Sequence, residues 1–402
     1  MKVIGIVAEF NPFHLGHKYL IDTTKEKLNA DLVICVMSGN FTQTGNIAIL
    51  DKFKRAKLAI SNGVDIVIEL PFIYSNSSAN LFSYGALNIL DKIGVVDILS
   101  FGSEIGSTTI LQDLYNKISD KQSFVDKYIK ENLKSNLSYA NIRENALKTF
   151  LSNYEINILR NPNNILGFEY IKAINSLNSK IKPFSIKREI NNHNSNKMPN
   201  LGNFASATAI RNQVLSGNFE NIVNYVPKDT YLELRNNTLT NNDMIFHILK
   251  YKILNCDINY LNSINEVNEG LEYKIKNEIK NSNDYTSFIN NIKSKRYKMS
   301  RIKRILNNIL LDITKLDFNE YYKNNSCYAH ILAASENGKK LFSEISNNLK
   351  KNNSYFLPKI TDDIILNLDN TTKRIIQKDI MASDFYSIIT NNNINLDYKN
   401  KL

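Results

Sequence analysis

The chain has 402 residues, of which 43% are hydrophobic and 22% are charged. This composition indicates a folded globular protein of two or three domains and excludes a disordered chain. No apolar run approaches the roughly 20 residues that cross a bilayer, so we expect no membrane span. The net charge of +11 favours a polyanionic partner such as nucleic acid, although the visible bias toward Asn, Lys, Ile and Tyr would raise the lysine count by itself.

The amino terminus predicts a buried first strand and no leader segment. Residues 3–10 read VIGIVAEF, in which Glu9 interrupts the apolar run and no small-residue cleavage site follows. The three cysteines, Cys35, Cys256 and Cys327, lie far apart and offer neither a disulfide framework nor a metal-ligand spacing. We therefore expect reduced thiols and a cytoplasmic location.

Short apolar runs alternate with helical patterns over the first 105 residues. The expected strands cover residues 3–10, 31–39, 64–72 and 96–104, and the expected helices cover residues 17–29, 48–63 and 78–94. Continuous apolar runs separated by helices are typical of a parallel sheet that is covered on both faces. This part of the chain therefore predicts an α/β fold.

The alternation continues more weakly to about residue 225. Residues 106–160 look helical and polar, residues 164–177 and 206–218 predict helices, and residues 181–189 predict a strand. Beyond that point the chain is rich in Lys and Asn and mostly helical in pattern. We expect an α/β domain over residues 1–227 and a mainly helical, basic domain over residues 228–402.

Two histidines follow the first predicted strand in the sequence EFNPFHLGH. Ligands of an open parallel sheet bind outside the carboxyl ends of its strands, so His14 and His17 fall at the expected ligand crevice. Gly16 allows close backbone approach, and the next helix offers free N–H groups to an anion. The two imidazoles could stabilise charge that develops at a nucleotide phosphate. A zinc pair, which lacks a third ligand nearby, and two structural histidines are the alternatives.

The pattern His14-Leu15-Gly16-His17 resembles the HxGH signature of a nucleotidyltransferase superfamily whose members attack the α-phosphate of ATP and release pyrophosphate. Ser206-Ala207-Thr208-Ala209-Ile210-Arg211 resembles that superfamily's second signature, at a helix start where hydroxyls and amides can hold phosphates. The resemblance implies a Rossmann-like parallel-sheet nucleotidyltransferase domain.

Further segments narrow the resemblance. GIVAEFNPFHLGHKYL, MSGNFTQTG, GVDIVIELPF, FGSE, PNNILGFEY and IKRE together resemble the tRNA(Met) cytidine acetate ligase family. The resemblance implies that acetate is activated with ATP as acetyl-adenylate. The acetyl group then passes to N4 of the wobble cytidine of elongator tRNA(Met), which becomes N4-acetylcytidine. Acetate, ATP, tRNA and Mg²⁺ on the phosphates are the implied ligands, and we expect neither a protein-bound metal site nor a stable protein partner.

The family's functional positions can be carried over residue by residue. The resemblance implies catalytic roles for His14 and His17. It implies ATP contacts along the loop from Val7 to Leu20 and at four strand or helix ends, with Asn163 preferred over its neighbour Asn164. The implied ATP-binding residues are Val7, Ala8, Glu9, Phe10, Asn11, Pro12, Phe13, His14, Leu15, Gly16, His17, Lys18, Tyr19, Leu20, Gly102, Asn163, Arg188, Ser206, Thr208 and Arg211.

One loop departs from the family pattern. Where the family usually has an arginine after the glutamine, this chain has Thr44. The missing guanidinium implies a weaker phosphate or tRNA contact at this loop, or a contact that Lys52 or Arg55 supplies instead. The densest basic run, residues 293–304, predicts a helix with a charged face. We expect it to contact the RNA backbone, with Tyr297 available for base stacking.

Two other functions remain open on the sequence alone. A small-molecule carboxylate ligase or nucleotidyltransferase, such as a pantothenate-synthetase-like enzyme, would use the same ATP signatures but leaves the basic carboxyl-terminal half unexplained. A non-catalytic RNA-binding protein would explain the charge but not the histidine pair.

Overall fold

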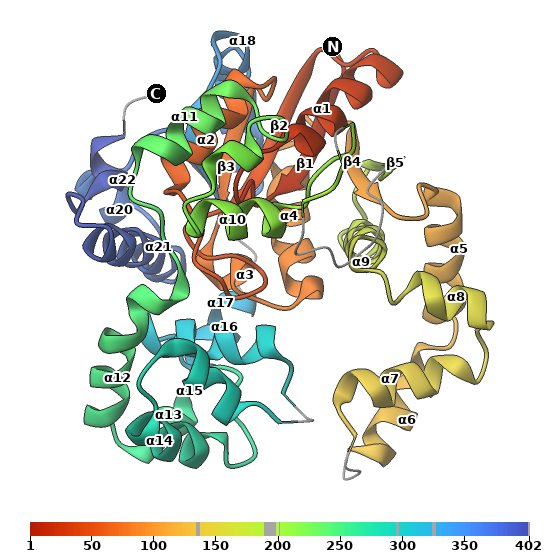
Figure 1. Ribbon diagram of the computed structural model, residues 1–402. Helices are drawn as coiled ribbons and strands as arrows, with labels where there is room; N and C mark the ends of the chain where they lie inside the picture. Colours follow the sequence, from red (N-terminus) through yellow and green to blue (C-terminus); the bar gives the residue numbers. More distant parts are fainter. Residues whose placement is uncertain (134–136, 189–197, 201, 295–296, 324–326, 401–402) are drawn as a thin grey trace.

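A seven-stranded sheet forms the centre of the computed structural model, which describes residues 1–133, 137–188, 198–200, 202–294, 297–323 and 327–400 (Figure 1). The strand order is β5-β4-β1-β2-β3-β6-β7. The strands are β1 (Val3–Ala8), β2 (Leu32–Ser38), β3 (Ile66–Leu70), β4 (Ile98–Ser103), β5 (Lys182–Lys187), β6 (Tyr328–Ala334) and β7 (Tyr355–Leu357).

The first five strands run parallel, as the sequence predicts. Successive residues of a strand point to opposite faces, so one apolar run serves two cores. Along β2, Leu32, Ile34 and Val36 belong to one core and the intervening Val33, Cys35 and Met37 to the other. The α/β, Rossmann-like fold class is confirmed.

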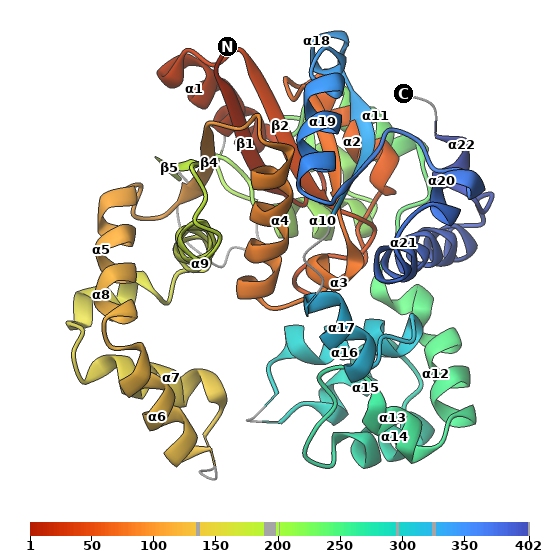
Figure 2. The same ribbon diagram turned by 180° about the vertical axis from the view of Figure 1, so that it is seen from behind.

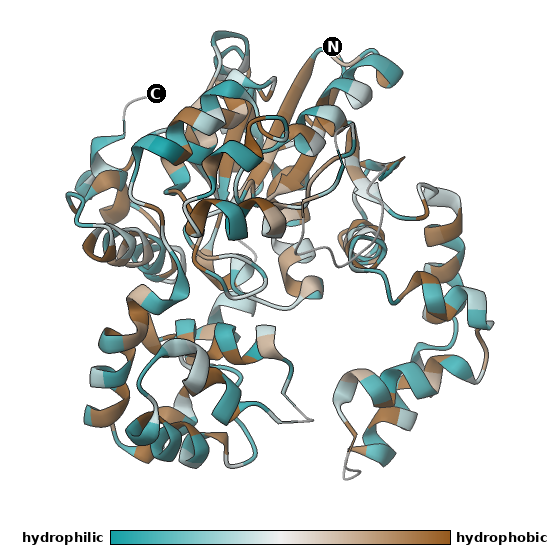
Figure 3. Cartoon of the chain, in the orientation of Figure 1, coloured by the Kyte–Doolittle hydropathy of each residue, from teal (hydrophilic) through white to brown (hydrophobic). Residues whose placement is uncertain are grey.

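Helices cover both faces of the sheet. One face packs against α4 (Ala79–Ile93), α9 (Pro162–Ser176) and α19 (Phe342–Lys351), with α4 and α19 in front of the sheet in Figure 2. The other face, nearer the viewer in Figure 1, carries α1 (Leu15–Leu28), α2 (Lys52–Ser61), α10 (Ala207–Leu215) and α11 (Lys228–Asn236). Among the helices nearest the viewer, α11 shows a mostly hydrophilic outer face (Figure 3).

Residues 108–133 and 137–158 form a helical arm that extends away from the sheet beside β4 and β5 (Figures 1 and 2). Its helices are α5 (Thr108–Ser119), α6 (Gln122–Asn132), α7 (Tyr139–Lys148) and α8 (Asn153–Ile158). Val125 and Ile129 of α6 pack with Ile142 and Ala146 of α7, and this cluster continues into the sheet core. The arm is therefore an extension of the α/β unit.

A second group of helices, the helical module of residues 246–294 and 297–310, has a hydrophobic core of its own. It contains α12 (Phe246–Asn255), α13 (Ile258–Ser263), α14 (Leu271–Asn281), α15 (Tyr285–Ile292) and α16 (Met299–Leu310). Phe41 and Ile47, from the loop after β2, and Phe72, after β3, are buried in this core. The loop after β2 is thereby fixed between the sheet and the module.

The carboxyl-terminal region differs from the sequence-based expectation because it returns to the sheet. β6 pairs antiparallel with β3, and β7 pairs parallel with β6. The run YAHILAA of β6 is buried over its first six residues. It is a single apolar run between polar segments rich in Lys and Asn, so the sequence there has no strand–helix alternation that would predict a strand. The last helices, α20 (Asp362–Leu366), α21 (Asn370–Ile389) and α22 (Leu396–Lys399), lie beside the sheet and the module (Figure 2).

The division at residues 227 and 228 stays a prediction. Val226, just before it, and Leu234 of α11, just after it, pack in the same core on the sheet. The remaining short helices are α3 (Phe72–Ser75), α17 (Lys315–Lys323), α18 (Glu336–Lys339) and two 3₁₀ turns at Phe219–Ile222 and Asn242–Ile245. Within the described ranges, no helix combines the length and apolarity that a bilayer span requires.

Candidate active site

The histidine pair closes the first turn of α1. His14 is the N-cap, and its Nδ1 atom accepts the Gly16 N–H at 3.1 Å. The His17 Nδ1 atom accepts the His14 N–H at 3.2 Å, which completes a capping box built from imidazoles. Because both Nδ1 atoms accept hydrogen bonds, each neutral ring carries its proton on Nε2. The helix start therefore fixes both the orientation and the tautomer of each ring.

The glycine between the histidines has a steric reason. The two rings stack with centroids 3.7 Å apart and an angle of 23° between their planes. A Cβ atom on Gly16 would lie 3.0 Å from His14 Cε1 and 3.1 Å from His14 Nδ1, which is tighter than ordinary van der Waals contact. The HxGH spacing thus lets the His14 ring fold back over the first turn of the helix.

Both histidines are neutral at physiological pH. Burial lowers the pKa of His14 to about 3, with the positive charges of Arg188 and Arg211 acting in the same direction. Burial also lowers the pKa of His17 well below its usual range, assisted by His14 and Arg188. A neutral imidazole with its proton on Nε2 is a hydrogen-bond donor that needs no change of protonation to bind a phosphate oxygen.

His17 borders a cavity of about 660 Å³ at the carboxyl ends of β1 and β4, a size typical of small-molecule sites. Several residues that the sequence assigned to ATP line it directly, and His17 is among them. These lining residues are Val7, Ala8, Glu9, Phe10, Asn11, His17, Leu20, Gly102, Asn163 and Arg188. The cavity therefore gathers residues from Ile6 to Ser300, which lie far apart in the sequence.

Other residues that the sequence assigned to ATP do not line the cavity. They are Pro12, Phe13, His14, Leu15, Gly16, Lys18, Tyr19, Ser206, Thr208 and Arg211. His14 is only 4% exposed and backs the His17 ring. Ser206 caps α10 by accepting the Ala209 N–H. Arg211 donates to the Asn11 carbonyl at 2.6 Å and to Thr208 Oγ1 at 3.0 Å, so its guanidinium holds the loop after β1. ATP roles for all of these residues stay predictions.

The ends of β4 and the start of α9 form the opposite wall. Glu104 Oε1 accepts the Asn163 N–H at 3.1 Å and Asn163 Nδ2 at 2.7 Å, and Glu104 Oε2 accepts the Asn164 N–H at 2.7 Å. Asn164 is 1% exposed and uses its amide on Ile105 N–H and the Ile158 carbonyl. Since only Asn163 lines the cavity, the geometry favours it over Asn164 as the nucleotide contact.

Arg188 crosses the end of β4 because Gly102 has no side chain. A Cβ atom at Gly102 would lie 3.1 Å from Arg188 Cγ and 3.5 Å from its Cδ. Burial lowers the pKa of Arg188, and the charge of Glu104 opposes that shift. Arg188 thus presents a partly desolvated positive charge to the cavity, where it is well suited to an anionic phosphate.

The expected replacement of the missing arginine at Thr44 is wrong. Arg55 is fully buried and donates to backbone carbonyls, at 2.6 Å to Glu9 and at 3.1 Å to Ser38. Lys52 is equally buried and belongs to an internal ion-pair network. Both side chains are therefore committed to holding the loops behind the cavity.

Positive charge reaches this loop from the helical module instead. Lys303 Nζ donates to Asn46 Oδ1 at 2.7 Å, and Arg304 Nη1 donates to the Gln43 carbonyl at 3.4 Å. Gly45 has a φ of +77° and sits against α16, where a Cβ atom would lie 2.5 Å from Lys303 Cβ. Gln43 and Thr44 line the cavity together with Lys298 from the same module.

The predicted stacking role of Tyr297 is also wrong. Its side chain is 7% exposed, its hydroxyl donates to the Asn268 carbonyl at 2.7 Å, and the Arg301 guanidinium covers its ring at 4.7 Å. Arg304 is 6% exposed. The basic run therefore contributes to the interior of the module as well as to its surface. Lys295 and Arg296 of that run, and His193 in the Asn-rich sequence at 191–196, lie outside the described residues.

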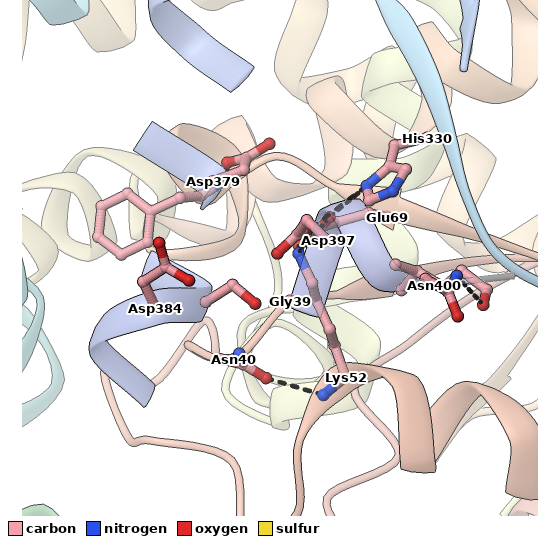
Figure 4. A network of polar contacts seen from close by, with 12 residues as sticks. Gly39, Asn40, Lys52, Glu69, His330, Asp379, Asp384, Asp397 and Asn400 are labelled. Atoms are coloured by element: carbon pink, nitrogen blue, oxygen red, sulfur yellow. Dashed lines mark hydrogen bonds and ion pairs between the residues drawn. The ribbon is translucent and has the colours of Figure 1, made fainter. Parts of the chain in front are cut away.

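A buried polar network joins the sheet to the last helices (Figure 4). Lys52 Nζ contacts Glu69 at 2.8 Å and Asp397 at 2.6 Å, and His330 Nδ1 lies 2.8 Å from Glu69 Oε2. Glu69, His330 and Asp397 could form a metal-binding set, but the Lys52 ammonium already provides the compensating charge there. His330 stands on β6.

Sequence reasoning missed part of the cavity wall. Arg160 lies two residues before Pro162 of the PNN segment of α9 and could have been found from that position, whereas Lys298 lies at the start of α16 in the distant helical module. Apolar members come from α4, β4 and α9, where an apolar residue carries no signal of ligand binding. These are Ala79, Phe82, Phe101, Ile165, Leu166 and Tyr170.

Comparison with known proteins finds relatives that match nearly the whole chain. A family model described as HIGH Nucleotidyl Transferase matches residues 1–401. A protein of Clostridium perfringens named tRNA(Met) cytidine acetate ligase is 37% identical over 99% of this chain and 98% of its own length. One of the same name from Clostridium novyi is 38% identical over 97% of this chain and 96% of its own length.

Solved structures show the same fold. The crystal structure of Thermotoga maritima TmcAL bound with alpha-thio ATP has a TM-score of 0.88 and 29% identity to this chain. The apo form of that protein has a TM-score of 0.89 and 30% identity. Each alignment covers 97% of this chain and 95% of the solved chain.

Proposed function

This chain belongs to the HIGH nucleotidyltransferase family, and we propose on that premise that it is a tRNA(Met) cytidine acetate ligase. It activates acetate with ATP and transfers the acetyl group to N4 of the wobble cytidine of elongator tRNA(Met), which yields N4-acetylcytidine. The observation that carries the proposal is the neutral His17 ring, fixed as an Nε2–H donor at the wall of a nucleotide-sized cavity.

In the first half-reaction, an acetate oxygen attacks the α-phosphorus of ATP. A P–O bond to acetate forms, the bond from the α-phosphorus to the bridging oxygen breaks, and pyrophosphate leaves with the bonding electron pair. The protein positions the reactants and stabilises the charge that develops on the phosphate oxygens. No covalent enzyme intermediate is required, in keeping with the fully buried Cys35.

We assign the phosphate contacts to His17 and Arg188. His17 donates Nε2–H, and Arg188 adds a charge-assisted hydrogen bond from the end of β5. His14 holds the His17 ring by stacking, and Arg211 holds the intervening loop through the Asn11 carbonyl. Asn163 contacts the nucleotide from the start of α9.

Magnesium ions fit the chemistry of this site through the substrate. Mg²⁺ prefers oxygen ligands and is usually bound by one or two carboxylates together with phosphates and water. Glu9 is the one carboxylate among the described residues that line the cavity, and we propose it as the protein ligand. The ion would neutralise phosphate charge when bound. Burial raises the pKa of Glu9, an effect that a bound cation would oppose.

In the second half-reaction, the exocyclic amine of cytidine attacks the carbonyl carbon of the mixed anhydride. A C–N bond forms, the C–O bond to AMP breaks with its electron pair leaving on AMP, and the amine releases one proton to water. An anticodon base has to leave its stack to reach an enclosed cavity. We propose that the helical module and the helical arm contact the tRNA, and that the protein is cytoplasmic.

ATP–pyrophosphate exchange with purified protein tests the first half-reaction. Labelled pyrophosphate should enter ATP when acetate is present, and a panel of other small acids should support much slower exchange. Exchange with a different acid but not with acetate would favour a small-molecule ligase. ATP binding without exchange for any acid would favour a non-catalytic RNA-binding protein.

A further inference from the structure

A second cavity, of about 530 Å³, adjoins the first at the base of the helical arm. Ala79, Arg160, Ile165 and Lys298 line both cavities. The remaining walls come from α7, α8, α9 and the start of α4, a region that Figure 1 shows between the arm and α9. A molecule in the second cavity would therefore lie directly beside whatever the first cavity holds.

Helix α9 forms the partition between the two spaces. Asn163, Leu166 and Tyr170 recur every three or four residues and face the first cavity. Glu169 and Lys172 face the second cavity. One helix thus presents a nucleotide contact on one side and a charged pair on the other, since residues at three- and four-residue spacing share a helix face.

Glu169 is the unusual residue of the second cavity. Its Oε2 atom is buried and has no hydrogen-bond partner among the described residues. Burial raises the pKa of its carboxyl group, and the charges of Lys172 and Arg143 act in the opposite direction. A buried carboxylate oxygen without a partner is costly, and it accepts hydrogen bonds only, so it fits a ligand that brings an N–H or O–H donor.

The mouth of this cavity has the features of a nucleotide site. Tyr139, at the start of α7, is 58% exposed and lines the cavity, where its ring can stack on a base. Arg143, Lys172 and Lys298 supply positive charge for the sugar–phosphate backbone. Arg160 is held by Glu144 at 2.6 Å and so stays at the wall that the two cavities share. Aromatic, cationic and acceptor groups meet within one space.

We propose that the second cavity receives the acceptor cytidine of the tRNA, with Glu169 accepting a hydrogen bond from its exocyclic N4 amine and Tyr139 stacking on the splayed base. The inference rests on the proposed function. Carboxylates suit cytosine because N4 is a donor there, whereas uracil presents the O4 acceptor at the same position. The N4 amine of the cytidine would then meet the acetyl-adenylate near Arg160 and Lys298, which line both cavities.

Binding of two tRNA transcripts tests the base contact. Elongator tRNA(Met) transcripts with cytidine or uridine at the wobble position are titrated in the presence of ATP and the absence of acetate. The parent protein should bind the cytidine form about 10-fold more tightly, as expected for one base contact. Glu169→Gln, whose amide can donate to O4 as well as accept from N4, should reduce this preference to within twofold. Unchanged discrimination in Glu169→Gln would overturn the proposal.

A comparison of half-reactions tests the stacking contact on an exposed residue, where loss of folding is not expected. Tyr139→Ala should leave acetate-dependent ATP–pyrophosphate exchange within twofold of the parent and lower kcat/KM for tRNA acetylation by about 10-fold or more. Tyr139→Phe, which keeps the ring, should stay within twofold in both assays. Glu131→Gln serves as a surface control, because the Glu131 side chain near the end of α6 is 61% exposed and does not line the cavity.

The outcomes separate this inference from the function on which it rests. Equal kcat/KM for tRNA acetylation by Tyr139→Ala and by the parent protein would overturn the cytidine site in the second cavity. Acetate-dependent ATP–pyrophosphate exchange would in that case still support the ligase function. Absence of acetate-dependent exchange in the parent protein would instead contradict the proposed function itself.

Discussion

Replacing His17 separates its role at the helix start from its role at the cavity. His17→Gln keeps a side-chain acceptor at the third helical position, where Glu and Gln complete a capping box, but replaces the preorganised imidazole Nε2–H donor with an amide N–H on a flexible side chain. His17→Ala removes both and leaves the His14 N–H without its 3.2 Å partner. We expect His17→Ala to be less stable than His17→Gln by about 1 kcal/mol, the usual net value of one such hydrogen bond.

The two variants should nevertheless lose the same activity. A preorganised donor to developing charge is typically worth about 10²- to 10³-fold in rate, so both should reduce kcat for ATP–pyrophosphate exchange by about that factor. Urea denaturation gives the stability difference, and exchange at saturating ATP and acetate gives the rates. Exchange near the parent level in a folded His17→Gln variant would refute the assignment of Nε2–H to the phosphates. Equal stability of the two variants would refute the capping role.

Three further predictions follow from neighbouring contacts. Burial lowers the pKa of His14 to about 3 from an unfolded value near 6.5. The neutral His14 ring therefore contributes its full stabilisation above pH 6.5, and this contribution is lost as the pH falls toward 3. Urea unfolding midpoints measured at a series of pH values should show the decline. Gly102→Ala places a Cβ atom 3.1 Å from Arg188 Cγ and should raise the KM for ATP about 10-fold, with little change in thermal stability. Asp397→Ala leaves the buried Lys52 ammonium with one fewer carboxylate partner. It should lower the free energy of unfolding, measured by urea titration, by about 3–5 kcal/mol. A loss below about 1 kcal/mol would show that the ion-pair network does not hold α22 against the sheet.

The sequence predicted the parallel half of the sheet well because each strand there is a continuous apolar run between helical patterns. The position of His17 at the end of β1 followed from the same pattern. The antiparallel β6 escaped prediction because one isolated run at residues 328–334 gives no periodic signal, and its partner β3 lies more than 250 residues earlier. Pairing over such distances is set by tertiary packing.

Side-chain roles in the basic segment were harder to predict. Tyr297 and Arg304 look like surface residues in a run of charges, yet the fold buries both within the helical module. Lys52 and Arg55 likewise carry ordinary surface residue types but serve internal contacts with Glu69 and backbone carbonyls. Burial of a long cationic side chain depends on the acceptors that the fold places around it, and local sequence does not specify these.

The choice between Asn163 and Asn164 shows the same limit on a smaller scale. Both asparagines start the same helix, and only the contacts of Glu104 and Ile105 distinguish the cavity-facing side chain from the buried one. The sequence could place the pair at the site, and the packing decides which member faces the ligand.

Transfer of oxygen from acetate to AMP tests the central claim most directly. The protein is incubated with ATP, elongator tRNA(Met) and acetate labelled with ¹⁸O in both carboxyl oxygens, and the AMP is analysed by mass spectrometry. Attack of acetate on the α-phosphorus predicts one ¹⁸O atom in each AMP formed together with N4-acetylcytidine. Unlabelled AMP, or formation of ADP in place of AMP and pyrophosphate, would contradict activation through acetyl-adenylate.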